Sequence, residues 1–398
     1  MANSLAPVTT NVIYFGRTLL EFLKNQLVLV GRCMTSYEGA ATAPGTTIQV
    51  PYISIPAAAA TRAIAGQAAA TAINAFTANV TMQQIFQAVT VDNLERLFSS
   101  VSLMEEAAKQ MAYNVAAKAD SMVAELAYRI GNATGDTDGT IAFDDSNKFT
   151  HLNNARKILM QNKSPMDDLT LALTPSEAAG WRAISTLGQV NTAGSDALLR
   201  QGSLGRAFGF EVMETQQIVT GYVGTTSSIT ASPAAVTNAS GYPVGTTTMN
   251  INSVGTGDIP KGATFTVASS GAIQKYSVTT AATIGGNAAT ISFWPPLTTA
   301  AIDTDVVTFD EYTGTSRSLN LAFNRNAILC VARPTLPFSS SSVGSYVVTD
   351  EQTGLSVRIA VEGNIIGNPG YTETIAADIV FGCEVVRPQS AVKIMGLN

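Results

Sequence analysis

The sequence predicts a mixed α+β protein with one long helix, several β segments and a small all-β barrel in the second half of the chain. Three observations support this class. Apolar residues recur every three or four positions over 101–130, which is typical of an amphipathic helix. Residues 222–309 hold only five charged residues and consist of short alternating runs between Gly, Pro and Asn turns. From residue 318 the alternating runs are longer and predict extended strands.

The composition indicates a protein whose surface is largely covered by other subunits. The chain has 398 residues, 46% hydrophobic but only 13% charged, about half the usual charged fraction. Scarce charge is typical of a surface that other subunits cover, because interface cores are depleted in charged residues. The net charge of −6 argues against tight nucleic-acid binding, which needs clustered Lys and Arg. The length suits two or three domains.

The sequence does not predict a transmembrane helix, a secretory signal peptide or disulfide bonds. No run of 18 apolar residues is present, so no transmembrane helix is predicted. The N-terminus has no basic segment followed by a cleavage site, which argues against a secretory signal. Cys33, Cys330 and Cys383 are far apart in sequence and indicate small apolar residues in a reducing compartment.

An amphipathic helix is predicted over 11–30, at the N-terminus. Its apolar positions lie three or four residues apart, at Val12, Phe15, Leu19, Leu23, Leu27 and Val30. An isolated helix of this length is marginal in water, so its apolar face must cover something. Packing on its own domain and docking on a neighbouring subunit both remain open.

A projecting two-stranded arm is predicted over 40–83. Two alternating runs flank an Ala/Gly-rich tip, and they carry Ile48, Val50, Tyr52, Phe76 and Val80. A two-stranded hairpin cannot bury itself, so we expect the arm to be floppy alone or ordered by a partner.

The segment after the long helix predicts β/α structure. A helix over about 149–162 precedes a strand at 169–173, and a second helix then begins with Thr174 as N-cap, Pro175 at N1 and Glu177 at N3, a capping box. This segment ends in a glycine turn, Gly202, Gly205 and Gly209, followed by the strand 210–214. Because a strand and not a helix follows these glycines, they are not a dinucleotide fingerprint.

Five or six short strands within 222–309 predict a small barrel or sandwich. The alternating runs lie at 249–252, 264–267, 275–278, 290–293 and 306–309. Beyond it, runs at 319–323 and 327–332 predict strands, and 355–363 with 372–384 predict a long hairpin.

Candidate catalytic and metal sites are nearly absent. The single histidine, His151, has no Gly-x-Ser-x-Gly motif with it and indicates a core or helix-start residue. Asp136–Gly139 matches part of a calcium loop but lacks the remaining ligands, which indicates a solvated turn. Gly255–Lys261 lacks the order of a P-loop and indicates a hairpin turn. We therefore predict no enzyme activity, no cofactor and no metal.

The order of these parts resembles the major capsid proteins of tailed bacteriophages with the Hong Kong 97 fold. The chain is most similar to the Salmonella podovirus type, which carries a β-barrel inserted in its apical domain. Three stretches carry the resemblance, namely Thr47–Pro51, Gly257–Phe265 and Phe381–Pro388. One departure is that Ala231–Thr246, where the podovirus type has a charged loop that contacts the neighbouring capsomer, contains no charged residue.

The resemblance implies a domain layout. It comprises an N-terminal arm (1–39), an extended loop (40–85), a peripheral domain (86–135 and 346–398), an apical domain (136–221 and 313–345) and the inserted barrel (222–312). It also implies subunit contacts through the N-terminal helix and the arm. The residues expected to make them are Val12, Phe15, Leu19, Leu23, Leu27, Ile48, Val50, Tyr52, Arg62, Phe76 and Val80. The turn at Gly202, Gly205 and Gly209 would lie in the apical domain.

The function implied is an icosahedral virion shell around a double-stranded DNA genome, assembled in the bacterial cytoplasm. The implied partners are other copies in pentamers and hexamers, a scaffolding protein, a portal protein and a cement or decoration protein, with no membrane and no sequence-specific DNA binding. An encapsulin-like compartment shares the fold and remains an alternative. A surface-layer protein or adhesin would also suit the Thr/Gly-rich β segment.

Overall fold

The computed structural model describes most of the chain, which falls into two compact units. The described residues are 16–23, 26–35, 46–53, 75–92, 103–135, 141–188, 204–222, 234–252, 254–255, 257–271, 274–310, 316–333, 335–336, 344–349, 356–364 and 372–397. Unit 1 comprises Met1–Ile48, Asn79–Val123 and Leu329–Glu384, and unit 2 comprises Gln49–Ala78, Ala124–Ile328 and Val385–Asn398.

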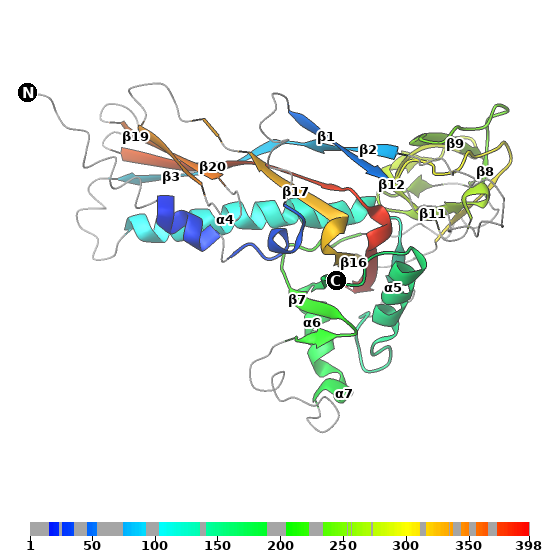
Figure 1. The fold of residues 1–398 in the computed structure, drawn as a ribbon, viewed down its shortest axis with the longest axis horizontal. Helices are drawn as coiled ribbons and strands as arrows, with labels where there is room; N and C mark the ends of the chain where they lie inside the picture. Colours follow the sequence, from blue (N-terminus) through cyan, green and yellow to red (C-terminus); the bar gives the residue numbers. More distant parts are fainter. Residues whose placement is uncertain are drawn as a thin grey trace, which may run out of the picture. The chain divides into compact units, whose positions relative to one another are not determined.

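Unit 1 is built from a long helix and an antiparallel sheet. The helix is α4 (Leu103–Glu125), and the strands are β3 (Gln83–Asp92), β17 (Ile328–Arg333), β18 (Gly344–Thr349), β19 (Ser356–Asn364) and β20 (Thr372–Val385). The 14-residue β20 is central, because β3, β17 and β19 all pair with it. Figure 1 shows α4 running along this sheet. The predicted C-terminal hairpin corresponds to β19 and β20, which pair antiparallel from Arg358 with Asp378 to Asn364 with Thr372.

The buried side of α4 is made largely of small residues. Ala108, Met111, Val115 and Ala119, which lie three or four positions apart, are buried, and so are Ala112, Ala116 and Val123 beside them. The helix then tightens into the 3-10 turn η2 (Leu126–Arg129). The helix predicted over 101–130 is therefore confirmed for 103–125. Alanine suits such a helix, because it has the highest helix propensity and lets neighbouring backbone approach closely.

The N-terminal helix is shorter than predicted. Residues 16–23 are helical, the Leu27 amide still donates to the Leu23 carbonyl over 3.1 Å, and the next regular element is the 3-10 turn η1 (Val30–Arg32). The prediction of a helix through residue 30 was wrong. The amides of residues 28–30 donate to the Asp120 carboxylate, so they are not used in helical hydrogen bonds.

Unit 2 contains a six-stranded mixed sheet. Its strands, in spatial order, are β4 (Ala133–Gly135), β21 (Ala391–Leu397), β16 (Arg317–Asn324), β5 (Leu169–Leu173), β7 (Phe210–Glu214) and β6 (Arg206–Ala207). The pairs β4–β21 and β5–β7 are parallel. The accompanying helices are α5 (Thr150–Gln161), α6 (Pro175–Ala183) and α7 (Ser185–Gly188). The fully buried Trp181 of α6 packs edge-on against Phe143 and Phe149 in this core.

Only one of the two hydrogen bonds of the predicted capping box forms at the start of α6. The Thr174 hydroxyl accepts the Glu177 amide over 3.3 Å, as an N-cap should. The Thr174 amide, however, donates to Asn320 Oδ1 over 2.9 Å. The Glu177 carboxylate instead accepts the amides of Ala142 and Phe143, at 3.1 Å each. Glu177 therefore ties a loop to the helix start.

Replacing Thr174 by alanine should lower the free energy of unfolding by about 1 kcal/mol, because it removes the N-cap acceptor. The shift in the urea midpoint measures it. Ser176→Ala changes an exposed residue two positions later and should alter the stability by less than about 0.5 kcal/mol. Equal losses in the two variants would contradict the capping role.

A closed six-stranded barrel occupies the region where the sequence predicted one. Its strands are β8 (Ala234–Val236), β9 (Thr248–Asn252), β11 (Thr264–Val267), β12 (Tyr276–Thr280), β14 (Ala288–Trp294) and β15 (Val306–Phe309). The strands β10 (Asp258–Ile259) and β13 (Ala282–Thr283) form a separate two-stranded antiparallel sheet. Phe265 is the centre of the barrel core, with its ring 5.4–5.5 Å from those of Tyr276, Phe293 and Phe309.

The chain enters and leaves the barrel region through one paired neck. The Tyr222 amide donates to the Arg317 carbonyl over 3.0 Å, and the Arg317 amide donates back to the Tyr222 carbonyl over 2.8 Å. Tyr222 and Arg317 thus flank the barrel strands on both sides in the sequence. Arg317 is also the first residue of β16, so the neck continues directly into the six-stranded sheet.

Candidate assembly surfaces

The N-terminal segment is held by a buried carboxylate on α4. Asp120 Oδ2 accepts the Val28 amide over 2.9 Å, and Oδ1 accepts the amides of Leu29 and Val30 over 3.1 and 3.0 Å. Burial raises the pKa of Asp120, while these three hydrogen bonds lower it and leave a net increase. One side chain thus satisfies three consecutive backbone donors and fixes the path of the segment on α4.

The helical residues 16–23 pack within unit 1. Leu19 and Leu23, two of the predicted subunit contacts, are fully buried, and Leu27 is half-buried. A Cβ added at Gly16 would lie 2.7 Å from side-chain atoms of both Val348 and Ile359, so the helix sits closely on β18 and β19. Within one chain, then, this apolar face already covers its own domain. Val12 and Phe15 lie outside the described residues.

The base of the arm has one buried face. The strands β1 (Thr47–Ile53) and β2 (Ala75–Thr81) form a two-stranded sheet. Of the predicted contacts, Ile48, Val50, Tyr52 and Val80 are buried and Phe76 is half-buried; Ala78 on the same face is also buried, whereas the alternating residues Gln49, Pro51, Thr77 and Asn79 are exposed. The expectation that the arm cannot bury itself was wrong for this base, because its alternating apolar face packs against its own chain.

Aromatic rings anchor the base of the arm in unit 2. The Tyr52 ring lies 5.6 Å from that of Phe76 and 6.2 Å from that of Trp294, at the end of β14. Tyr52 therefore joins the arm to the barrel. Arg62, the remaining predicted contact of the arm, lies outside the described residues.

The glycine turn forms a tight two-residue hairpin. Ala207 pairs with Phe210, and the intervening Phe208 and Gly209 both have positive φ, of 51° and 88°. Positive φ at both positions is the requirement of a type I′ turn. Gly205 also has a positive φ, of 68°, whereas Gly202 lies outside the described residues. The Phe208 ring is exposed and its carbonyl accepts from Arg156, so the turn presents an aromatic residue on a fixed backbone.

A second exposed surface, on the sheet of unit 1, was not predicted. Phe86 is 71% exposed and Leu336 82% exposed. Arg358 connects them: its Nη1 donates to the Leu336 carbonyl, and its Nε and Nη2 donate to Asp378, the residue that pairs with Phe86 across the strands. Gln84 also donates to Asp378, over 2.6 Å. The alternation of Ile85 and Phe86 in an uncharged run was the available signal.

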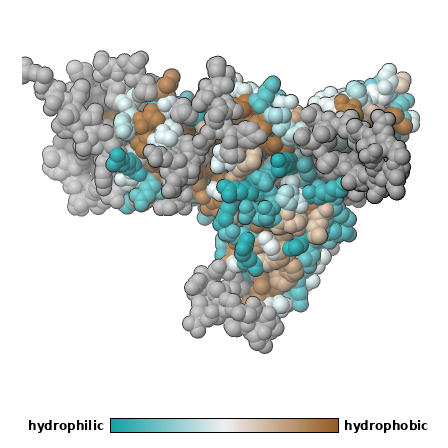
Figure 2. Space-filling model, in the orientation of Figure 1, coloured by the Kyte–Doolittle hydropathy of each residue, from teal (hydrophilic) through white to brown (hydrophobic). Residues whose placement is uncertain are grey.

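The exposed apolar residues of the described part of the chain are spread over several elements and do not form one large hydrophobic patch. Ile302, Val306 and Val244 are exposed on the barrel, in addition to Phe86 and Leu336 in unit 1. Hydrophobic and hydrophilic residues are interspersed over the described part of the face drawn in Figure 2. Such a surface fits several moderate contacts better than a single large one.

The histidine and the cysteines occupy buried or half-buried positions. His151 is buried at the start of α5, as the sequence predicted. The described part of the chain contains no group of three or more His, Cys, Asp or Glu side chains arranged to hold a metal ion. The three cysteines are free thiols; Cys33 and Cys330 are hydrogen-bonded neighbours despite their distance in sequence, and burial raises the pKa of Cys330 far above its ordinary value.

Among the described helices, none combines the length and the hydropathy needed to span a bilayer.

Known proteins resemble this chain in fold and not in sequence. No family model and no curated protein matches the sequence. The structure is similar to a chain of Mycobacterium phage Che8, with 16% identity and a TM-score of 0.51, over 93% of this chain and 91% of that one. It is also similar to the capsid of the cyanophage P-SCSP1u, with 12% identity and a TM-score of 0.47, over 89% of this chain and 85% of that one. A third similar structure is the virus-like particle from Pyrococcus furiosus, with 8% identity and a TM-score of 0.44, over 96% of this chain and 97% of that one.

Proposed function

We propose that the protein is the major capsid protein of a tailed double-stranded DNA phage and assembles into an icosahedral shell. The observation that carries the proposal is the fold likeness to a phage Che8 chain over nearly the full length of both proteins. The long helix against an antiparallel sheet, the two-stranded arm and the barrel add support, because they are the parts that the sequence resemblance implied.

The assembly mechanism we propose is geometric. Each copy contributes several small apolar surfaces, among them the Phe86–Leu336 face, the Phe208 turn and the exposed barrel residues. A standard interface buries about 1,600 Å² in total. A subunit with several contacts needs no single strong one, and the low charge of 13% reduces the number of charges to be desolvated.

The net charge suits a container for DNA. At −6, the chain repels a polyanion on average, so the genome would be enclosed without sequence-specific binding. A scaffolding protein, a portal protein and a decoration protein are proposed as further partners on the resemblance alone.

Replacing the arm tip, residues 56–72, by a two-residue Asn-Gly turn tests the proposal that the arm contacts a neighbouring copy. We expect the variant to remain a folded monomer, because Tyr52 and Val80 at the base of the arm are retained, but to fail to form shells. Sedimentation and electron microscopy measure assembly, and circular dichroism with urea unfolding measures the fold. Shells of normal yield from this variant would contradict the proposed contact.

A further inference from the structure

A fully buried lysine lies between the six-stranded sheet and the barrel. Lys393 is in the middle of β21, where its backbone pairs with Leu321 of β16 and Ala133 of β4. A lysine is almost never fully buried unless its amine is paired. The contacts of this amine are therefore informative.

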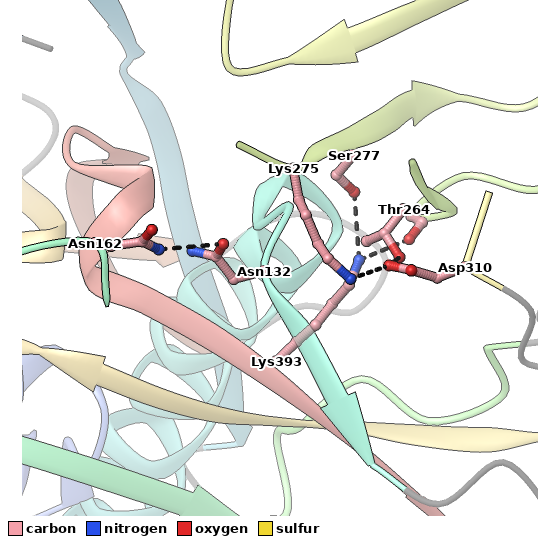
Figure 3. A network of polar contacts seen from close by, with 8 residues as sticks. Asn132, Asn162, Thr264, Lys275, Ser277, Asp310 and Lys393 are labelled. Atoms are coloured by element: carbon pink, nitrogen blue, oxygen red, sulfur yellow. Dashed lines mark hydrogen bonds and ion pairs between the residues drawn. The ribbon is translucent and has the colours of Figure 1, made fainter. Parts of the chain in front are cut away.

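The amine of Lys393 reaches from the sheet to the barrel. Its Nζ donates to the Gly262 carbonyl over 2.6 Å and to Ser277 Oγ over 3.3 Å. Gly262 precedes β11, and Ser277 is in β12. The Ser277 hydroxyl itself donates to the Tyr128 carbonyl over 2.7 Å, so it can only accept from the lysine. Figure 3 shows Lys393 pointing from its strand toward Ser277.

The site offers acceptors for a neutral amine and not for an ammonium. Two acceptors match the two N–H bonds of a neutral amine, whereas an ammonium has a third. No described carboxylate lies within ion-pair distance of Lys393. Asp310, the acid whose charge acts on Lys393, accepts instead from Lys275 over 2.6 Å and from the Thr264 hydroxyl over 2.8 Å.

The charges around the amine act on it in opposite directions, and burial is the largest effect. The elements packed around Lys393 carry further titratable or charged side chains: Lys275 and Asp310 on the barrel, Arg317 on β16, Tyr128 on η2, His151 on α5 and Glu177 on α6. Burial lowers the pKa of Lys393 from 10.5 to about 7, with Lys275 lowering it further and Asp310 opposing. Burial also raises the pKa of Tyr128, which stays neutral.

We propose that Lys393 makes the docking of the barrel on the six-stranded sheet dependent on pH, with the neutral amine as the docked form. The proposal is independent of the shell function. It concerns the contact between the barrel and the six-stranded sheet, which both belong to unit 2. The binding or release of one proton by Lys393 sets the strength of this contact.

The direction and the pH window follow from linkage. When the barrel separates from the sheet, the amine enters water and regains a pKa near 10.5. Between about pH 7 and 10.5 the separated state therefore holds one proton more than the docked state, and docking strengthens about tenfold for each pH unit. Below about pH 7 both states are protonated, so the docking equilibrium is flat and weakest.

Hydrogen exchange of the neck amides, Tyr222 and Arg317, measures the opening of this joint. After correction for intrinsic exchange, we expect their protection in the wild-type protein to be constant from pH 5 to about 7. Above that pH it should rise by up to about tenfold per unit. In Lys393→Met this slope should disappear. Lys118→Met makes the same change at an exposed lysine of α4 and should leave the slope intact.

A second variant keeps the proposal falsifiable if Lys393→Met fails to fold. Lys275→Met removes a neighbouring positive charge and releases Asp310, so the pH at which the slope begins should move upward. A purely structural role of Lys393 would not move it. A wild-type protein without a slope, a Lys393→Met variant that retains it, or a Lys275→Met variant with an unchanged onset would each overturn the proposal.

Discussion

Replacing Glu177 by alanine should lower the free energy of unfolding by about 3–4 kcal/mol. Its carboxylate is fully buried and accepts the amides of Ala142 and Phe143. Each hydrogen bond to a charged group contributes about 1.5–3 kcal/mol, and both donors would remain buried without an acceptor. Urea unfolding of the purified protein measures the loss.

Two further variants separate the hydrogen bonds from the side-chain volume. Glu177→Gln keeps the shape and one acceptor oxygen, so it should cost about half as much. Gly396→Ala does not change residue 177 itself. The new Cβ at residue 396 would collide with Glu177 Oε1 and push the carboxylate away from the two amides. If Glu177→Ala and Glu177→Gln were equally stable, the charge-assisted hydrogen bonds would not be the source of the effect.

Replacing Asp120 by alanine should release the N-terminal segment from α4. The amides of Val28, Leu29 and Val30 would lose their common acceptor, at a cost of about 3 kcal/mol for the group. This loss corresponds to more than a hundredfold in the local opening equilibrium. Hydrogen exchange of these three amides should accelerate accordingly, while Ser121→Ala, a change at the half-buried neighbour whose hydroxyl donates to the Lys118 carbonyl, should leave them unaffected.

Comparing the pH dependence of stability in the wild-type protein and in Asp120→Asn tests whether the Asp120 carboxylate that holds the N-terminal segment titrates. Because burial raises the pKa of Asp120 above 3.8, the native state binds more protons than the unfolded state just above that pH. The contribution of Asp120 to stability therefore falls as pH rises from about 4 until the carboxyl group is ionised in both states. The wild-type protein should show this decline relative to Asp120→Asn. Parallel pH curves for the two proteins would contradict a buried, titrating carboxylate.

Much of the fold was predictable because local patterns dominate it. The strands at 169–173, 210–214, 264–267 and 306–309 are observed with the predicted bounds, since each is a short alternating or apolar run between turn residues. The barrel was recognisable from its composition for the same reason. Long-range pairing left no such signal: β3, β18 and β21 were not predicted.

The side chains that connect distant segments could not be predicted. Asp120 meets residues about ninety positions away, and Lys393 meets Ser277 across 116 positions. In sequence, each looks like an ordinary charged residue on a helix or strand. Burial and the geometry of their acceptors appear only when the chain is folded, because tertiary contacts override local propensity.

The anchor at Asp120 changes how the N-terminus should be tested. Deleting residues 1–30 would remove any contact with a neighbouring copy, but it would also strip Leu19 and Leu23 from the core of unit 1 and leave Asp120 without its donors. Failure of such a variant to assemble would not distinguish the two causes. Replacing the arm tip leaves both the N-terminal anchor and the base of the arm in place.

The most direct test of the shell function is electron microscopy of the purified protein, with and without a co-expressed scaffolding protein. We predict closed, uniform icosahedral particles whose hexamers and pentamers are built from this chain alone, and DNA inside particles taken from infected cells. Flat arrays, particles that enclose a co-purifying enzyme in place of DNA, or a protein that stays monomeric under every condition would contradict the proposed function.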